Sequence, residues 1–191
     1  NGIRGGSATV HFPIWHQEIR DILVLKNNKG TEDNRVRKLD YSIQISKLFY
    51  ERFIQDEEIS LFSPHSVPDL FESFGTPDFD ELYCSYENDK SIPRTTIGAQ
   101  ELIMDLLKER SETGRIYIMN IDHCNEHSSF KDKVSMSNLC QEITLPTEPI
   151  QHIDAIDGEI ALCILSAINV GKLKNLDELE ELCDLSVRSL E

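Results

Sequence analysis

Two hydrophobic spacings alternate along the chain, one typical of strands and the other of helices. Residues 8–15 are mostly apolar and predict a buried strand that ends or bulges at Pro13. Residues 39–45 alternate between apolar and polar positions, as a strand does, and residues 58–63 predict another short strand. The nearly continuous apolar run at 115–121 is typical of a strand buried inside a parallel sheet.

Helical spacing fills most of the stretches between these strands. The clearest case is residues 99–110, where Leu102, Ile103, Leu106 and Leu107 form one apolar stripe and Gly114 is placed to end the helix. The other predicted helices cover residues 16–28, 46–55, about 69–90 with a break at 75–77, and 175 onward, where Asn175 and Glu178 suit a first turn.

The pattern is weaker in the second half of the chain. Residues 122–136 predict a polar loop, and residues 142–146 predict a strand. Residues 160–170 fit either a buried strand or the start of a helix, and their β-branched content favours the strand. Because strands and helices alternate, the predicted fold class is α/β with mostly parallel strands. The 191 residues are enough for one domain, 1–191.

Composition narrows the function classes. The formal net charge of −15 argues against a surface for nucleic acid or for an anionic membrane, because both need a basic face. No apolar run approaches the roughly 20 residues that span a bilayer. The five cysteines are odd in number and irregularly spaced, so we expect reduced thiols in a cytoplasmic protein. The start at Asn1, without an initiator Met or a signal-peptide layout, suggests the middle of a longer protein.

The stretch richest in chemistry is residues 137–147. Cys140 stands between the amide Asn138 and the carboxylate Glu142, each two positions away. In an extended chain, residues two apart point to the same side, so these three side chains would face one ligand. They would offer it a redox-capable sulfur, a neutral hydrogen-bonding group and a base. The alternative is a polar loop with a buried cysteine, since a free cysteine is usually a small hydrophobic residue.

Residues 137–147 resemble the active-site segment of the catalytic subunit of class I ribonucleotide reductase. Further segments resemble the same family, and they occur in the family's order: 4–6, 25–30, 114–118 and 158–163. The resemblance implies a central fragment of the large (alpha) subunit. It further implies part of a ten-stranded α/β barrel, with Cys140 on a finger loop inside it.

The resemblance also implies roles for particular residues. Cys140 would become a thiyl radical that removes the 3′-hydrogen of the ribose, and Glu142 would be the general base for the 3′-hydroxyl. Asn138 would hold the sugar hydroxyls, and Cys163 would be one cysteine of the redox-active dithiol. The substrate-binding residues would be Asn138, Leu139, Cys140, Gln141 and Glu142. Arg4, Gly5 and Gly6 would belong to the loop that links the effector site to the substrate; the alternative is an unstructured terminus.

Cofactors and partners follow from the same resemblance. We expect no metal and no cofactor on this chain, because a small metal-containing subunit supplies the radical. Nucleoside triphosphates act as effectors of the intact enzyme, which is a homodimer. The substrate is a ribonucleoside diphosphate, and thioredoxin or glutaredoxin returns the electrons. The location is the cytoplasm, or the host cytoplasm if a phage encodes the chain. Because regions that the family needs are missing, we expect the isolated chain to be inactive.

Two hypotheses from other classes remain. The first is a stand-alone metal-binding or thiol-redox module. His123 and His127 are four apart with Cys124 beside them, and Cys140 adds another sulfur, although a helix across this stretch is doubtful. The second is an interaction fragment whose exposed strand edges assemble with partners. A chain that cuts a barrel exposes apolar surface, so we expect self-association.

Overall fold

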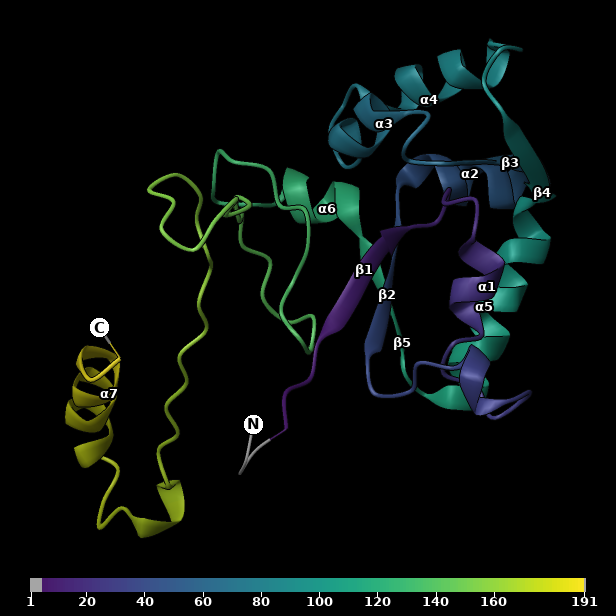
Figure 1. Cartoon of the computed structure of the whole chain (residues 1–191). Coiled ribbons are helices and arrows are strands. Elements are labelled where there is room, and N and C mark those ends of the chain that lie inside the picture. The colour runs from purple at the N-terminus through teal and green to yellow at the C-terminus, as the bar shows by residue number, and fades with distance from the viewer. Residues whose placement is uncertain (1–4, 191) are drawn as a thin grey trace. The chain divides into compact units, whose positions relative to one another are not determined.

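The computed structural model describes residues 5–190, which divide between Glu159 and Ile160 into two compact units (Figure 1). Each unit is described by itself. The prediction that residues 1–191 form a single domain stays a prediction. The α/β class is confirmed in the first unit, where strands and helices alternate along the chain.

A parallel three-stranded sheet is the centre of the first unit. Its strands are β1 (Thr9–Pro13), β2 (Asp40–Ile45) and β5 (Ile116–Asn120), in the order β1-β2-β5. All three were predicted, and β1 ends at Pro13 as expected. The register pairs His11 with Ser42 and Ser42 with Tyr117. Paired residues of neighbouring strands point to the same side, so the sheet has two chemically distinct faces.

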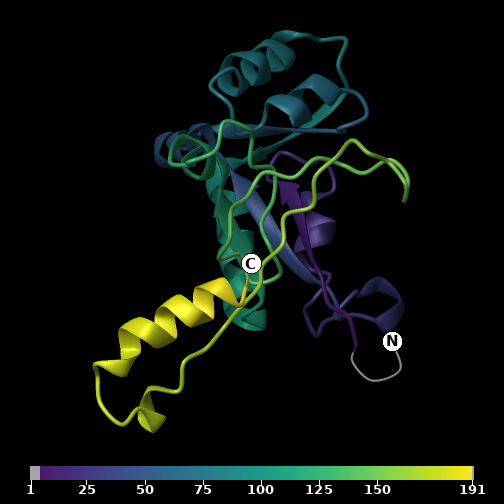
Figure 2. The same cartoon turned by 90° about the vertical axis from the view of Figure 1, so that its left-hand side faces the viewer.

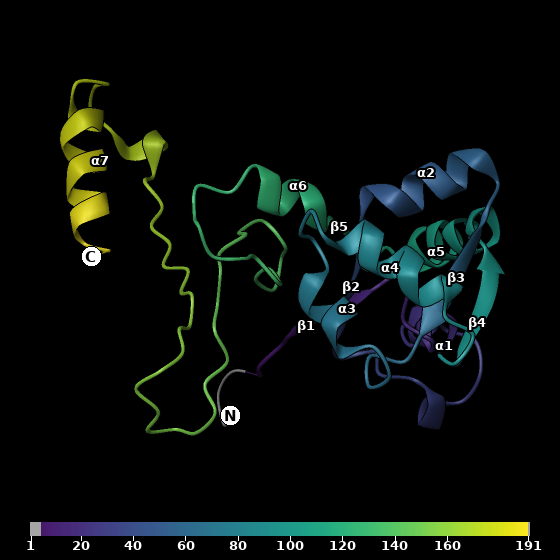
Figure 3. The same ribbon diagram turned by 90° about the horizontal axis from the view of Figure 1, so that it is seen from above.

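One face of the sheet is apolar and the other is polar. The apolar face carries Phe12, Ile43 and Ile45, all buried on the side of α1 (Ile19–Leu23) and α5 (Ala99–Thr113). The polar face includes Ser42 and Gln44, which are buried as well. Figures 2 and 3 show the irregular segment 128–159 on this second side of the sheet. The alternation in β2 therefore separates two buried faces, and neither side of this strand faces water.

A second sheet pairs β3 (Glu58–Phe62) with β4 (Arg94–Gly98), and the two strands are antiparallel. Strand β3 was predicted, whereas β4 was missed, although Thr95, Thr96 and Ile97 form a β-branched run. The expectation of mostly parallel strands therefore holds for one sheet of the first unit and is wrong for the other. Helix α2 (Lys47–Gln55), which precedes β3, is confirmed.

Aromatic side chains fill the core beneath α3 (Pro68–Ser73) and α4 (Phe79–Asn88). These two helices confirm the predicted helical stretch with its break near Gly75. The ring centroids of Phe74 and Phe79 lie 4.6 Å apart, and those of Phe49 and Tyr83 lie 5.3 Å apart at nearly a right angle. Phe49 and Tyr83 form an edge-to-face pair, whereas the rings of Phe74 and Phe79 are tilted; geometries of this kind favour one arrangement of the core.

Several helix boundaries differ from the prediction. The helix expected at 16–28 is only α1, and a short 3-10 helix, η1 (Glu32–Asn34), follows it. The loop expected at 122–136 begins as a helix, α6 (Ile121–Glu126). Helix α5 ends at Gly114, whose φ of 65° is the left-handed conformation that glycine adopts without strain.

The strand predicted at 142–146 is wrong. Residues 128–159 contain no regular helix or strand, only an isolated bridge between Glu148 and Glu159. Pro146 and Pro149 have no N–H to donate to a neighbouring strand, which favours an irregular path.

The second unit contains η2 (Val170–Lys172) and α7 (Glu178–Arg188). The strand favoured at 160–170 is wrong, because this segment pairs with no strand of the described chain and has no regular structure. The expected start of the last helix is confirmed: Asn175 Oδ1 accepts hydrogen bonds from the N–H groups of Asp177 (2.9 Å) and Glu178 (3.2 Å). Among residues 5–190, no helix has both the length and the apolar character needed to cross a membrane.

Candidate active site

The polar face of the parallel sheet holds the segment that carries Cys140. Thr9 on β1 donates a hydrogen bond of 2.6 Å from its hydroxyl to the carbonyl oxygen of Leu139. Gln44 on β2 donates one of 2.6 Å to the carbonyl oxygen of Ser135. The loop is therefore fixed by side chains that a parallel register places on one face.

Gln141 makes two further hydrogen bonds to the same sheet. Its Nε2 donates to the carbonyl oxygen of Ile118 on β5 at 2.7 Å, and its Oε1 accepts from the hydroxyl of Ser42 on β2. The side chain of Gln141 thus bridges two neighbouring strands beneath the loop.

Cys140 lies on a hydrogen-bonded turn. The N–H of Gln141 donates to the carbonyl oxygen of Asn138 at 3.1 Å, which closes a turn over residues 138–141. The Oδ1 atom of Asn138 accepts from the N–H groups of Glu142 and Ile143, each at 3.1 Å. This turn replaces the extended chain from which we argued that residues 138, 140 and 142 face one side, so that geometric argument is wrong.

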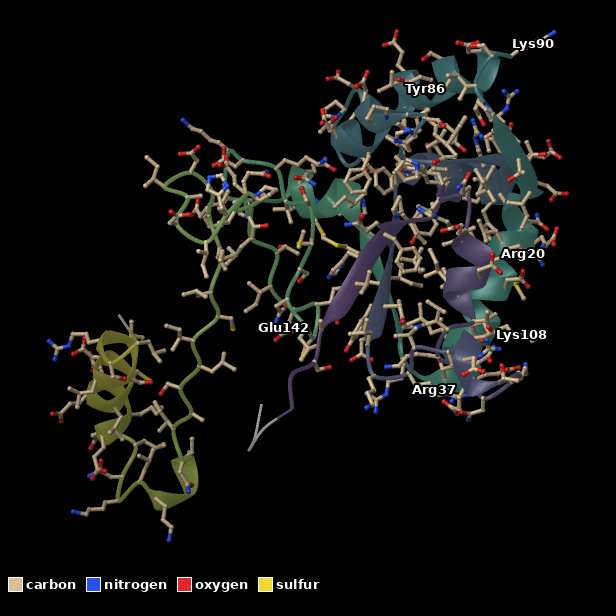
Figure 4. The ribbon with its side chains drawn as sticks, viewed as in Figure 1. Arg20, Arg37, Tyr86, Lys90, Lys108 and Glu142 are labelled. Carbon is tan, nitrogen blue, oxygen red and sulfur yellow. The ribbon has the colours of Figure 1, made fainter. Side chains whose placement is uncertain are left out.

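The turn separates its side chains into two groups. Cys140 and Glu142 are exposed, and Leu139 is 40% exposed. Asn138 and Gln141 are partly buried, and both amides are used to hold the turn. Figure 4 shows Glu142 on the loop beside the start of β1. A thiol within the turn and a carboxylate directly after it are therefore both exposed to solvent.

The sheet beneath the turn carries an imidazole whose ring nitrogens are buried. Both ring nitrogens of His11 are buried and lack a hydrogen-bond partner among the described residues. Burial lowers the pKa of His11, and the adjacent backbone of Ser137 raises it by less. Because burial disfavours the charged form, His11 is neutral near neutral pH.

A small cavity of about 270 Å³ lies between the turn and α6. Gln141 and Thr144 line one part of it, and His123 and Cys124 another. Burial raises the pKa of the Cys124 thiol, which keeps it protonated near neutral pH.

One histidine lies in α6 and another directly follows it. The ring centroids of His123 and His127 lie 5.8 Å apart, because His127 caps the C-terminal end of α6 about one turn after His123. Within residues 5–190, however, no group of three or more His, Cys, Asp or Glu side chains is placed to hold a metal ion. Zinc sites use three or four protein ligands, so this pair gives the metal-binding hypothesis little support.

The remaining predicted residues lie outside the turn. Gly5 and Gly6 are exposed and have no regular structure, and Arg4 lies outside the described residues. Cys163 belongs to the second unit, where its thiol is free and exposed. Thr9, Ser42 and Gln44 were not predicted as site residues. The signal available for them was the polar side chains at alternate positions of strands that were expected to be buried.

The fold and the turn define a class first: an α/β protein that presents a thiol and a carboxylate from a turn bonded to the polar face of a parallel sheet. A sequence profile described as "Ribonucleotide reductase, barrel domain" matches residues 1–191, and the chain belongs to that family. The resemblance seen in the sequence is confirmed, and the parallel sheet is part of that family's barrel.

Individual relatives agree with this assignment. The ribonucleoside-diphosphate reductase subunit alpha of Haemophilus influenzae is 57% identical over 195 residues, which cover 100% of this chain and 26% of the relative. The subunit alpha of reductase 1 from Escherichia coli is 51% identical over 154 residues, or 78% of this chain and 20% of the relative. The subunit alpha of Enterobacteria phage T4 is 43% identical over 198 residues, with 100% and 26% covered. The chain therefore spans about a quarter of the length of these curated relatives.

Proposed function

We propose that this chain is the part of a ribonucleoside-diphosphate reductase alpha subunit that carries the radical cysteine, and that it acts in the reduction of ribonucleotides to deoxyribonucleotides. The observation that carries the proposal is the turn at 138–141, which exposes Cys140, is followed directly by the exposed Glu142 and is hydrogen-bonded to the polar face of the sheet. The names and identities of the relatives support it.

Cys140 is the hydrogen-atom abstractor in this proposal. Its sulfur, as a thiyl radical, takes the 3′-hydrogen of the ribose, so that an S–H bond forms, the C3′–H bond breaks and a carbon radical remains. Glu142 accepts the proton of the 3′-hydroxyl as general base, and the 2′-hydroxyl takes a proton from the redox-active dithiol and leaves as water. Once the dithiol has reduced the sugar, the Cys140 S–H bond breaks and its hydrogen atom returns to C3′. In this proposal one sugar contacts both exposed side chains, which are two positions apart in the sequence.

Asn138 binds the sugar through one particular atom. Its Oδ1 already accepts two backbone N–H groups, so it is engaged in the turn. The Nδ2 group has no hydrogen-bond partner within residues 5–190, and it is the atom left to donate to a sugar hydroxyl. Leu139, also exposed, adds apolar contact area at the same place.

Two electrons and two protons come from a dithiol that is oxidised to a disulfide. Cys163 is one of its two cysteines, consistent with a free and exposed thiol. Thioredoxin or glutaredoxin returns the dithiol to its reduced form. The second cysteine lies outside this chain in the proposal, so the chain needs the rest of the subunit for turnover.

The remaining partners complete the proposal. A small metal-containing subunit supplies the radical, and the alpha subunit works as a homodimer. Nucleoside triphosphate effectors act through the loop that includes Arg4, Gly5 and Gly6. Alone, with the small subunit and a thiol reductant, the 191-residue chain shows no turnover of a ribonucleoside diphosphate.

A chimera tests the proposed function. The aligned residues of the Haemophilus influenzae subunit are replaced by this chain, which they cover completely, and diphosphate reduction is measured with the small subunit of the host enzyme. Cys140→Ser reduces turnover to background, because oxygen forms too strong a bond to hydrogen to act reversibly. Glu142→Gln lowers kcat about 10²- to 10⁴-fold, the usual contribution of a general base.

Cys183→Ser is the matched control, since Cys183 is also a free, exposed cysteine but lies on α7. Its kcat stays at the level of the unsubstituted chimera. Turnover that survives Cys140→Ser, or a folded chimera with no activity before any substitution, contradicts the proposal.

A further inference from the structure

Two of the hydrogen bonds between the loop and the sheet meet at the residue directly after Cys140. The amide of Gln141 donates to the carbonyl oxygen of Ile118 at 2.7 Å and accepts from the hydroxyl of Ser42. Ser42 is fully buried in the middle strand of the sheet, so this contact has a fixed base. We call the pair of contacts from Gln141 to Ser42 and to Ile118 the latch.

The backbone of Gln141 supplies an independent observation. Its φ of 61° lies in the left-handed region, where a residue with a side chain costs roughly 1–2 kcal/mol more than in its ordinary conformation. Such a conformation persists only where the surroundings enforce it, and it often marks a functional site. The latch is the surrounding contact that enforces it here, because it fixes the far end of the same side chain.

Without the latch, the side chain of Gln141 could adopt another rotamer. Gln141 borders the cavity of about 270 Å³ that also contacts His123 and Cys124. A side chain released from Ser42 can rotate into this space, and the turn that depends on it then has more than one arrangement. The latch therefore restricts the turn to one orientation.

We propose that Gln141 and Ser42 are positioning residues, which fix the turn so that Cys140 is held in one orientation above the sheet. This inference rests on the proposed function of Cys140. It also revises the expected role of Gln141, because the carbonyl and one N–H of its amide are used by the sheet instead of the substrate. Thr9, which holds the carbonyl oxygen of Leu139 at 2.6 Å, supports the other side of the cysteine.

Amide hydrogen exchange of the 191-residue chain tests the latch without any turnover. In Ser42→Ala, the amides of residues 141–143 exchange about tenfold faster, because the loop opens more often when a hydrogen bond is lost. Ser42→Thr keeps the hydroxyl and restores the slow exchange. Ser46→Ala is the matched control, since Ser46 is equally buried but its hydroxyl has no hydrogen-bond partner in the described chain, so the loop stays protected.

Gln141→Gly separates the effect of the side-chain hydrogen bonds from the effect of the backbone conformation. Glycine adopts a positive φ without strain, so this variant keeps the turn conformation but loses the latch. Its loop amides exchange faster than those of the unsubstituted chain. If Gln141→Gly and Ser42→Ala both exchange as slowly as the unsubstituted chain, the inference is overturned.

The chimera described above separates this inference from the proposed function. Ser42→Ala in the chimera lowers kcat severalfold with KM for the diphosphate unchanged, because the cysteine is misplaced while the substrate still binds. An inactive chimera whose loop exchange still depends on Ser42 contradicts the proposed function alone. If the chimera is active but Ser42→Ala changes neither its kcat nor its amide hydrogen exchange, the result contradicts the latch alone.

Discussion

At the scale of single residues, the polar face of the sheet places an imidazole where it cannot easily be charged. His11 lies beside the backbone of Ser137, and burial lowers its pKa. A proton on His11 would be buried without a counter-charge, directly below the segment that carries Cys140. The charge state of this one side chain therefore affects the order of the loop above it.

Acid should destabilise the chain through His11. Because its pKa is lower in the folded state, the unfolded chain binds more protons, and stability falls as the pH drops below about 6.5. The urea midpoint, measured at about pH 7.5 and about pH 5.5, therefore decreases in the unsubstituted chain and decreases less in His11→Gln.

Part of the dependence remains in His11→Gln, because burial also lowers the pKa of His16. An identical pH dependence in His11→Gln and in the unsubstituted chain would mean that His11 is not the group responsible.

At the scale of elements, a tyrosine hydroxyl forms the hydrogen bonds that a neighbouring strand would otherwise form with the edge of β3. β3 pairs with β4 along one edge. On its other edge, the hydroxyl of Tyr83 on α4 accepts from the N–H of Ser60 at 2.8 Å and donates to the carbonyl oxygen of Ser60 at 2.6 Å. Two buried backbone groups are satisfied in this way, which links the aromatic core to the second sheet.

Tyr83→Phe should destabilise the chain by about 2 kcal/mol, because it leaves these two buried backbone groups without a partner while the ring stays in place. Chemical denaturation measures the difference. Tyr86→Phe on the same helix changes stability by less than about 0.5 kcal/mol, since Tyr86 is only partly buried and its hydroxyl has no hydrogen-bond partner in the described residues. Equal effects of the two substitutions would show that the Ser60 contacts do not stabilise the fold.

The elements that the sequence predicted well are those whose signal is local. The apolar run of β5 and the apolar stripe of α5 can each be recognised within a short window of sequence, although β2 and α1, which help to bury them, lie far away in the chain. The strands predicted at 142–146 and 160–170 are wrong because a strand also needs a partner, and partners are not visible in a short window. Helix α6 was missed because six residues are too few to show a helical period.

The site was predictable only in part for a related reason. The sequence grouped Asn138, Cys140 and Glu142 by their spacing alone, and the first two lie in one turn whose Asn138 side chain accepts from the N–H of Glu142. The contacts that hold the turn join residues 99 positions apart in Ser42–Gln141 and 130 apart in Thr9–Leu139. A local sequence pattern contains no information about contacts between residues so far apart in the chain. The sheet residues of the site were therefore not identified from the sequence.

At the scale of the whole molecule, large apolar side chains remain uncovered in both units. Leu139 and Phe130 are exposed in the first unit. In the second, Leu162, Ile164 and Leu165 are each at least 60% exposed along a segment without regular structure. Uncovered apolar area of this kind marks a surface for contact with protein.

The chain should therefore self-associate. Light scattering gives an apparent mass above the 21.9 kDa of one chain, and the mass rises with concentration. Leu162→Glu together with Ile164→Glu shifts the mass toward that of one chain, because charge opposes apolar contact. Asp157→Glu, a change nearby that keeps the charge, leaves the association as it was. A monodisperse monomer at all concentrations contradicts this expectation.

The two buried faces of β2 have a consequence for how this strand can diverge. One face of β2 packs in the apolar core through Tyr41, Ile43 and Ile45. The other face donates hydrogen bonds from Ser42 and Gln44 to a loop that begins about ninety residues later in the chain. Neighbouring residues of β2 are thus constrained by different parts of the protein. A polar substitution on one face or an apolar substitution on the other would lower stability, so a design that transplants this strand must include the loop as well.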